Sequence, residues 1–192
     1  EFTVVYAGSI SGIEGVDVLI DAFRMVCAIA RRRVRLFIVG NPAHNETLER
    51  YEAPAADLIH PGLVTFLPSV DHARYASILR GADLLVIPRP NSVASCAGFP
   101  YKLVECIASG TPVLVTRFGD VEEYFEDNVH CLMCAPGDPD SLSRRILFAM
   151  DRTVELGALA TEGQKRVREL FAFESVAGQL RRTLDGISAR KR

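Results

Sequence analysis

Lys102 and Glu105 stand three residues apart in a segment that reads as a helix, and their charges suit phosphate and ribose respectively. Residues three apart in a helix lie on the same face. The N–H groups at the start of a helix attract phosphate, and Lys102 adds a full positive charge there. The Glu105 carboxylate, one turn deeper, can accept hydrogen bonds from a ribose diol. An ordinary surface ion pair between the two side chains is the alternative that the spacing leaves open.

A second candidate is the segment Gly8-Ser-Ile-Ser-Gly-Ile-Glu-Gly15, which connects an apolar run to an amphipathic one. Its three glycines let the backbone approach a ligand closely, and the following helix offers N–H groups to an anion. The spacing matches neither the dinucleotide-binding fingerprint nor the P-loop, which ends in Gly-Lys-Ser/Thr. Phosphate binding and a turn that simply requires glycine therefore both stay open.

These segments must be positioned by the rest of the chain, which alternates short apolar runs with longer amphipathic segments. The apolar runs predict strands at residues 2–8, 35–40, 63–67, 83–88, 112–116 and 130–133. The amphipathic segments predict helices at about 16–30, 44–58, 72–80, 100–109 and 120–126, then from 138 to the end, with breaks near Gly157 and Ala172. Strands that are apolar throughout belong to a sheet covered on both faces, and alternation with helices makes that sheet parallel.

The expected fold is α/β: a doubly wound, Rossmann-like parallel sheet of about six strands with helices on both faces. A single domain is expected over residues 1–192. Such a sheet binds ligands at the carboxyl ends of its strands, where the strand order reverses. The loops that follow the first, second, fourth and fifth strands are therefore the candidate sites, at residues 8–15, 40–45, 88–99 and 117–120.

Composition and charge narrow the functional classes. The chain has 192 residues, is 48% hydrophobic and carries a formal net charge of −2, so nucleic acid is not an expected partner. No apolar run reaches the roughly 20 residues that span a bilayer, and no transmembrane segment is expected. The five cysteines lie mostly in apolar segments, as buried thiols in a reducing cytosol do. Cys131 and Cys134 form an isolated C-x-x-C pair, which we interpret as structural, so no metal site is expected.

The segment 98–115 has the sequence Gly-Phe-Pro-Tyr-Lys-Leu-Val-Glu-Cys-Ile-Ala-Ser-Gly-Thr-Pro-Val-Leu-Val. It resembles the signature of group 1 (family 4) glycosyltransferases with the GT-B fold, in the subgroup written FP-x-K-x-x-E-x-x-A-x-G-x-P-V. Other segments resemble the family in the right order, at residues 4–8, 15–23, 36–40, 64–68, 82–88, 120–123 and 135–142. The chain is thereby identified as the C-terminal, donor-binding half of such an enzyme, and the N-terminal acceptor domain is expected to be absent from it.

The resemblance implies retaining, metal-independent transfer of a sugar from a nucleotide-diphosphate donor, without a cofactor. Glu105 would bind the nucleotide ribose, while Lys102, Leu103 and the helix start would lie against the diphosphate. Two loops would complete the donor site. Phosphate and donor sugar would meet the loop of Gly8, Ser9 and Ile10, and the base would meet the backbone of the loop of Leu67, Pro68, Ser69, Val70 and Asp71.

Three positions depart from the family pattern. Ser9 stands where the family usually has an arginine and Glu14 where it usually has a lysine, and those two cations hold the diphosphate in the better-known members. Lys102 and Arg89 are then the diphosphate stabilisers that this chain retains. Ala97 stands where the common signature has an acid that contacts the sugar, so the identity of the donor sugar is not predicted.

The same resemblance makes residues 173–192 a C-terminal helix that would reach back to the absent half of the enzyme. Its exposed apolar face predicts an association site, for that half or for a second copy of the chain. The fragment is expected to be inactive alone. The full-length protein is expected in the cytoplasm, either free or at the periphery of a membrane.

Two other functions stay open. A sugar-nucleotide epimerase of the same fold would need histidine and acidic groups in the cleft, and the candidate histidines are His44, His60, His72 and His130. Each of these reads more simply as a surface loop residue. A non-catalytic nucleotide-sugar-binding module is favoured by Ser9 and Glu14 and opposed by Lys102 and Glu105.

Overall fold

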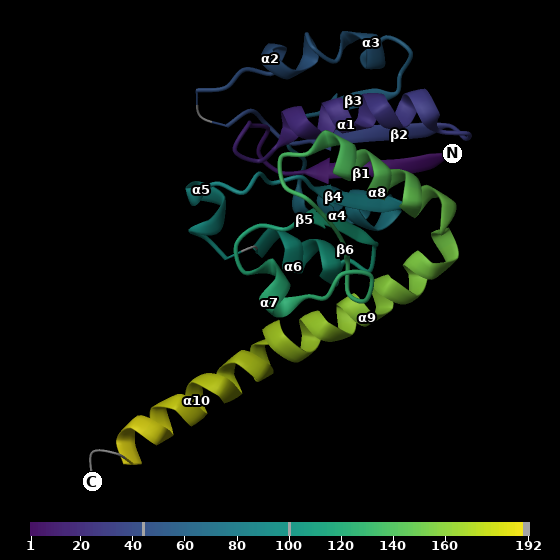
Figure 1. Cartoon of the computed structure of the whole chain (residues 1–192). Helices are drawn as coiled ribbons and strands as arrows, with labels where there is room; N and C mark the ends of the chain where they lie inside the picture. Colours follow the sequence, from purple (N-terminus) through teal and green to yellow (C-terminus); the bar gives the residue numbers. More distant parts are fainter. Residues whose placement is uncertain (44, 100, 190–192) are drawn as a thin grey trace.

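The computed structural model describes residues 1–43, 45–99 and 101–189. Within these residues, parallel strands form one sheet in the order β3-β2-β1-β4-β5-β6 (Figure 1). The strands are β1 (Phe2–Ala7), β2 (Val34–Val39), β3 (Val64–Leu67), β4 (Leu84–Ile87), β5 (Val113–Thr116) and β6 (Leu132–Cys134). The predicted doubly wound, Rossmann-like α/β fold is therefore confirmed, and each predicted strand is found within a few residues of its expected position.

The strand order reverses at β1, which pairs with β2 on one side and with β4 on the other. The chain first moves outward from β1 to β3 and then returns to β4 on the opposite side of β1. Loops that leave the carboxyl ends of β1 and β4 therefore diverge, and this is where open α/β sheets bind their ligands.

Helices cover both faces of the sheet (Figure 1). One face packs against α1 (Val16–Ile29) and α8 (Pro139–Asp151), and the other against α4 (His72–Gly81) and α6 (Tyr101–Ala108). The last covering helix, α9 (Thr153–Phe171), contributes Leu156 and Leu159 to the first core and Val167 to the second. Successive residues of a strand point to opposite faces. Accordingly Val4 and Tyr6 belong to the first core, and Val5 and Ala7 to the second.

Two local predictions about helices are wrong. Residues 44–58 form two short helices, α2 (Glu49–Glu52) and α3 (Ala56–Ile59), rather than one helix. Pro54 lies between them, and a proline has no N–H with which to continue a helix. The loop after β4 contains a helix that was not predicted, α5 (Val93–Cys96), whose first turn is capped by Ser92 Oγ accepting from Ser95 N at 3.1 Å.

The helices of the C-terminal region are interrupted at other positions than predicted. No break occurs at Gly157, because α9 runs through it and Leu156 and Leu159 on either side are buried against the body of the protein. The breaks lie instead at Arg152, before α9, and at Ala172, as predicted, before α10 (Phe173–Ala189). Figure 1 shows α10 extending away from the sheet and its covering helices. No helix in the described ranges is both long and apolar enough to cross a membrane.

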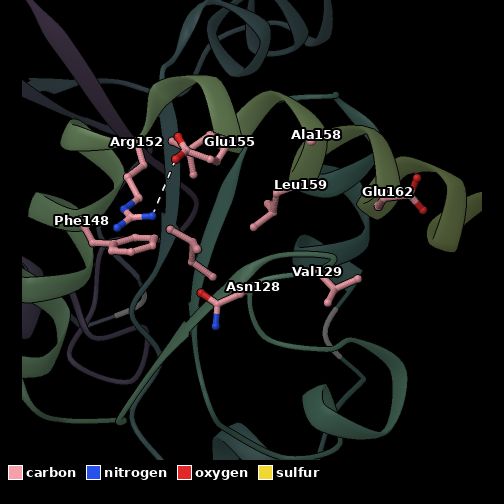
Figure 2. A pocket seen from close by; sticks show the side chains of 10 residues that line it. Asn128, Val129, Phe148, Arg152, Glu155, Ala158, Leu159 and Glu162 are labelled. Atoms are coloured by element: carbon pink, nitrogen blue, oxygen red, sulfur yellow. Dashed lines mark ion pairs between the residues drawn. The ribbon is translucent and has the colours of Figure 1, made fainter.

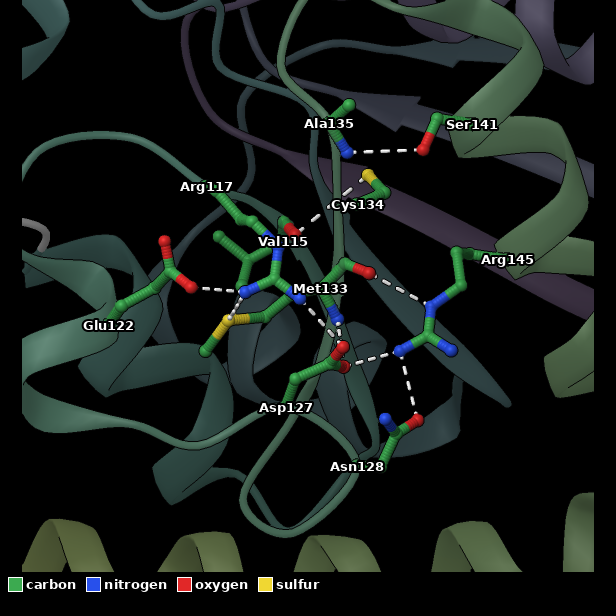
Figure 3. Close-up of polar contacts among 10 residues, drawn as sticks. All are labelled: Val115, Arg117, Glu122, Asp127, Asn128, Met133, Cys134, Ala135, Ser141 and Arg145. Atoms are coloured by element: carbon green, nitrogen blue, oxygen red, sulfur yellow. Dashed lines mark hydrogen bonds and ion pairs between the residues drawn. The ribbon is translucent and has the colours of Figure 1, made fainter.

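The outer edge of the sheet is closed by polar side chains around Asp127 (Figure 3). Asp127 Oδ1 accepts from Met133 N of the edge strand β6 at 2.8 Å, and Oδ2 accepts from Arg117 Nη2 at 2.8 Å. Arg145 of α8 also donates to Asp127, and its Nε donates to the Met133 carbonyl at 2.9 Å. The exposed N–H and C=O of an edge strand are thus satisfied within the protein.

The two cysteines of the C-x-x-C pair do not face each other. Cys131 and Cys134 are buried, and they belong to the cores on opposite faces of the sheet. Burial raises the pKa of each thiol to about 12. Two sulfur atoms on opposite faces cannot bind one metal ion together.

Candidate functional site

Two pockets lie at the carboxyl edge of the sheet, on the loops that leave β1, β2, β3 and β4. The first has a volume of about 140 Å³ and is lined by Glu14, Ile87, Arg89, Phe99, Tyr101, Lys102, Leu103 and Phe118. The second has a volume of about 310 Å³ and is lined by Gly8, Ser9, Val39, Gly40, Asn41, Pro42, Ser69, Val70 and Tyr75. They adjoin where the Lys102 ammonium lies over Gly8. We call the two pockets together the edge groove.

Glu14 stands at the centre of the first pocket between two cations. Its Oε2 lies 2.8 Å from Lys102 Nζ, and its Oε1 lies 2.7 Å from Arg89 Nη2. The three groups come from three elements: the loop after β1, the end of β4 and the first turn of α6. The Glu14 side chain is only 15% exposed, so both ion pairs are largely shielded from water. The predicted alternative of an ion pair between Lys102 and Glu105 is wrong.

The aromatic side chains around the groove hold the two cations in place. Lys102 Nζ lies 5.1 Å from the centre of the Tyr6 ring, and Arg89 Cζ lies 5.5 Å from the centre of the Phe118 ring. Both distances are within the range of a cation–π interaction. The Tyr6 hydroxyl donates to the Ser9 carbonyl at 2.5 Å, and burial, together with the nearby Glu14 charge, raises the Tyr6 pKa well above its usual range. Tyr6 is therefore a neutral donor that fixes the loop after β1.

Glu14 is ionised at neutral pH. Burial by itself raises the pKa of this carboxyl, but the charges and hydrogen bonds of Lys102 and Arg89 outweigh burial, and the pKa lies below its ordinary value of 4.5. The first pocket therefore carries two positive charges and one negative charge. Its remaining positive charge is available to an anion.

The glycines at the ends of β1 and β2 allow the close approach on which the edge groove depends. A Cβ atom on Gly8 would lie 2.1 Å from Lys102 Nζ, and a Cβ atom on Gly40 would lie 1.9 Å from the Gly8 carbonyl oxygen. Both glycines have positive φ angles, 154° and 148°, which other residues rarely adopt. Glycine is thus required at both positions for Lys102 to reach across the strand ends.

The predicted base-binding loop forms the far side of the edge groove. Ser69 N donates to Asn41 Oδ1 at 3.2 Å, which fastens this loop to the loop after β2. Asp71 caps α4 by accepting from Arg74 N at 2.9 Å. Pro68 and Ser69 are exposed, and Leu67 and Val70 are half-buried. An exposed backbone beside a pocket of this size is suited to a flat ring.

Glu105 is exposed on α6 and lines neither the first pocket nor the second. Tyr75 lines the second pocket, and its pKa is raised to about 12 by burial first and then by the nearby Cys106 and Glu105. Lys102 lines the first pocket, and the contact of Glu105 with a ribose stays a prediction.

Other predicted residues contribute less directly. Ile10 is fully buried, and its N–H donates to the Asn41 carbonyl at 2.9 Å. Neither its side chain nor its N–H is therefore available to bind a sugar nucleotide. Leu103 is also fully buried, and its side chain forms part of the core below the first pocket.

Ser9 is exposed at the edge groove. Ala97 is exposed at the end of α5. Pro100, from the resemblance signature, lies outside the described residues.

The described histidines do not line either pocket of the edge groove. His60 and His72 are exposed, before β3 and at the start of α4 respectively. His130 accepts a hydrogen bond from Glu126 N at 3.0 Å, and burial, followed by the Arg166 charge, lowers its pKa. His44 lies outside the described residues. No described histidine is placed for the acid–base chemistry that an epimerase needs.

Sequence reasoning missed the position of Glu14 between two cations and the contributions of Asn41, Tyr6 and Phe118. Glu14 stood out only as a departure in sign from the family pattern. A carboxylate in a glycine-rich loop is a signal that a cation lies nearby, but its partners are distant in the chain. The aromatic residues looked like ordinary core residues.

A further pocket of about 280 Å³ lies beside the amino end of β6, away from the edge groove (Figure 2). Phe148, Leu156 and Leu159 make most of its wall apolar, and an ion pair of 3.7 Å between Arg152 and Glu155 crosses its rim. This pocket lacks the paired cations and the glycine backbone that the edge groove offers to a phosphate.

Strand order and groove together define a Rossmann-like α/β domain with two cations and one carboxylate clustered at its switch point. The model of the family "Glycosyl transferases group 1" matches residues 1–152, and the chain belongs to this family. It is 29% identical over 159 residues to an MMP α-(1→4)-mannosyltransferase of Mycolicibacterium hassiacum, covering 79% of this chain and 36% of the relative. It is 27% identical to the mannosylfructose-phosphate synthase of Agrobacterium fabrum, covering 95% of this chain and 40% of the relative. The chain thus spans less than half the length of these relatives.

Solved structures share the fold. Anabaena HepE, crystallised in complex with UDP and glucose, superimposes with a TM-score of 0.77 at 22% identity, over 97% of this chain and 48% of HepE. The C-terminal domain of the group 1 glycosyl transferase LpcC from Francisella tularensis has a TM-score of 0.77 at 15% identity, and the match covers 90% of this chain and 87% of that domain. The GT-B fold expected from the resemblance is thus supported over nearly the whole chain.

Proposed function

We propose that this chain is the donor-binding half of a retaining glycosyltransferase that uses a nucleotide-diphosphate sugar. The observation that carries the proposal is the meeting of Lys102 and Arg89 at the switch point of the sheet, beside Gly8 and the first turn of α6. Two cations, an accessible backbone and the N–H groups of a helix start are the groups that bind a diphosphate.

The two pockets of the edge groove divide the donor between them. Lys102, Arg89 and the start of α6 would bind the diphosphate in the first pocket. The second pocket would bind the nucleoside, with its base against the backbone of Ser69 and Val70 and its ribose hydroxyls on the Glu105 carboxylate. Lys102 lies over Gly8 at the junction of the two pockets, where the phosphates of such a ligand must pass.

The chemistry follows from the charges. When a sugar leaves its donor, negative charge develops on the diphosphate, and preorganised cations and N–H dipoles stabilise that charge. Lys102 and Arg89, with α6, can supply this stabilisation, and we propose that the reaction needs no metal ion. Retention of the anomeric configuration is proposed from the resemblance to the family.

The acceptor is proposed to bind to a second domain of the full-length protein. Two observations support this: the chain spans less than half of its relatives, and α10 carries an uncovered apolar stripe. The stripe consists of Phe173, Val176, Leu180, Leu184 and Ile187, each at least 48% exposed. A stripe of this kind on an extended helix would pack against that domain. The free thiols of all five cysteines favour the cytoplasm as its location.

Calorimetric titration with UDP, GDP and ADP tests the donor site, because the identity of the base is not predicted. For whichever nucleotide binds the chain, Lys102→Met should weaken binding about tenfold or more, since a charge-assisted hydrogen bond is lost. Glu105→Gln should weaken nucleoside-diphosphate binding and leave pyrophosphate binding unchanged. Lys165→Met is the matched control, because Lys165 is 67% exposed on α9, away from the edge groove. Equal affinity in the Lys102 and Lys165 variants would contradict the proposal.

One observation favours a second function, a non-catalytic module. Glu14 already neutralises part of the charge of Lys102 and Arg89. If this neutralisation abolishes donor binding, wild type should bind no nucleoside diphosphate at millimolar concentration, and removing the Glu14 charge should restore binding. The variant described next distinguishes this module from a working donor site.

A further inference from the structure

Glu14 occupies the centre of the proposed diphosphate site in the way that an anionic ligand would. Its two carboxylate oxygens each take one cation, at 2.7 Å from Arg89 Nη2 and 2.8 Å from Lys102 Nζ. These are the lengths of charge-assisted hydrogen bonds to a phosphate oxygen. The same N–H groups cannot donate to the carboxylate and to a phosphate at once.

The charges make the conflict stronger. With Glu14 in place, the first pocket has one net positive charge, whereas a diphosphate brings at least two negative charges. A carboxylate and a phosphate that share two donors at about 3 Å would repel each other strongly in a shielded site. A diphosphate can take the N–H groups that now bind Glu14 only after the Glu14 carboxylate has moved away.

The backbone around Glu14 is pinned, so the movement must come from its side chain. Gly15 has a φ of 77°, and a Cβ atom there would lie 2.0 Å from the Pro88 carbonyl oxygen, which shows how tightly the loop packs against the end of β4. Glu14 N donates to the Ser11 carbonyl at 3.2 Å. Rotation about the side-chain bonds of Glu14 breaks three hydrogen bonds, two from Arg89 and one from Lys102, and leaves this loop intact.

We infer that Glu14 is a built-in competitor of the donor diphosphate, which holds Lys102 and Arg89 while the site is empty and lowers its affinity for nucleoside diphosphates. This inference rests on the proposed donor site. It assigns Glu14 the role of setting how tightly that site binds phosphate. It also explains how two cations stay close together in a shielded pocket without a ligand.

The test compares wild type, Glu14→Gln and Glu14→Asp in calorimetric titrations with UDP, GDP and ADP, and with the matching nucleosides. Glu14→Gln keeps the shape of the side chain and removes its charge, and Glu14→Asp keeps the charge. Glu155→Gln is the control, because Glu155 is in a single ion pair with Arg152 away from the edge groove. Circular dichroism melting shows that each variant is folded before it is titrated.

For the diphosphate that binds, we expect Glu14→Gln to tighten affinity about tenfold or more, since two charge-assisted contacts become available to the ligand. Nucleoside affinity should not change, and Glu155→Gln should bind like wild type. Glu14→Asp, which keeps the charge on a side chain one methylene shorter, should gain less affinity than Glu14→Gln. The tightening should persist at about 1 M salt, where the Debye length is about 3 Å, because the competition is by direct contact. If the gain in affinity vanishes at high salt, the inference is overturned, because the effect of Glu14 would then be long-range electrostatic repulsion that salt screens.

The inference and the proposed function fail differently. If wild type binds a nucleoside diphosphate and Glu14→Gln binds it equally or more weakly, the donor site stands and the inference is wrong. If neither binds any of the three diphosphates at millimolar concentration, the proposed function is wrong and the inference falls with it. Binding by Glu14→Gln alone supports the inference and favours the non-catalytic module, because Glu14 would then keep the wild-type site from binding its donor.

Discussion

Glu14 Oε2 lies 2.8 Å from Lys102 Nζ, although 88 positions separate the two residues in the chain. The contact crosses the point where the strand order reverses, because Glu14 follows β1 and Lys102 begins α6 after β4. Arg89 completes the cluster from the end of β4. This relationship makes one carboxylate responsible both for local stability and for the charge of the edge groove.

The stability of the chain should depend on pH through Glu14. Because the pKa of Glu14 in the folded protein lies below 4.5, its ion pairs stabilise the fold fully above about pH 4.5. That stabilisation is lost as the pH falls through the lower, folded-state pKa. Urea unfolding at a series of pH values from 7 to 3 should therefore show a shallower acid loss for Glu14→Gln than for wild type. Parallel curves would contradict the role assigned to these ion pairs.

Gly40→Ala should destabilise the fold by about 2 kcal/mol more than Gly62→Ala. Both glycines have positive φ angles, 148° and 72°, but a Cβ on Gly40 meets the Gly8 carbonyl at 1.9 Å, whereas nothing lies within 4 Å of one on Gly62. The extra cost is that of moving backbone in a packed site. Urea denaturation of the two variants measures it. Equal free energies of unfolding would show that the strand ends separate without cost.

Asn41→Ala should weaken binding of a nucleoside diphosphate severalfold and leave pyrophosphate binding unchanged. Asn41 Oδ1 accepts from Ser69 N at 3.2 Å and so holds the loop that is proposed to contact the base. Losing one such hydrogen bond costs about 1 kcal/mol, which limits the effect to roughly fivefold. Titrations of the variant and of Gln179→Ala, an exchange on α10, give the comparison. Equal loss for both ligands would place Asn41 at the phosphates instead.

Asp127→Ala should lower the free energy of unfolding by about 2–3 kcal/mol. The exchange removes the acceptor of Met133 N on the edge strand and leaves Arg117 and Arg145 without their shared anion (Figure 3). Asp185→Ala on α10 is the matched control, because Asp185 is exposed. Denaturant unfolding of both variants measures the loss in the free energy of unfolding that each exchange causes. A loss no larger than that of the control would mean that water replaces Asp127 at the sheet edge.

The 192-residue chain alone should self-associate through α10. Phe173, Val176, Leu180, Leu184 and Ile187 recur every three or four residues and form one stripe along the helix. Leu180→Glu should reduce the association seen in sedimentation equilibrium, while Ser175→Glu should not, since Ser175 lies on the opposite side of the helix. If the wild-type chain is monomeric at about 100 μM, the exposed apolar stripe does not drive self-association.

Local pattern predicted most elements well. Runs such as Leu84–Ile87 and Val113–Thr116 are apolar at every position, and only a strand covered on both faces accommodates such short runs. The errors arose where local signals were weak. Residues 44–58 were expected to form one polar helix and Gly157 to break another, whereas Pro54 and the burial of Leu156 and Leu159 decided the outcome.

The sequence by itself determined the alternation of strands and helices, the edge of the sheet where the candidate loops meet, and Lys102 and Arg89 as cations at that edge. Only the tertiary structure decided that Glu14 lies between them. Periodicity and capping act over a few residues, whereas this cluster joins residues 75 and 88 positions apart. Strand order, which depends on how the whole sheet assembles, brings β1 beside β4 and so selects which charges meet.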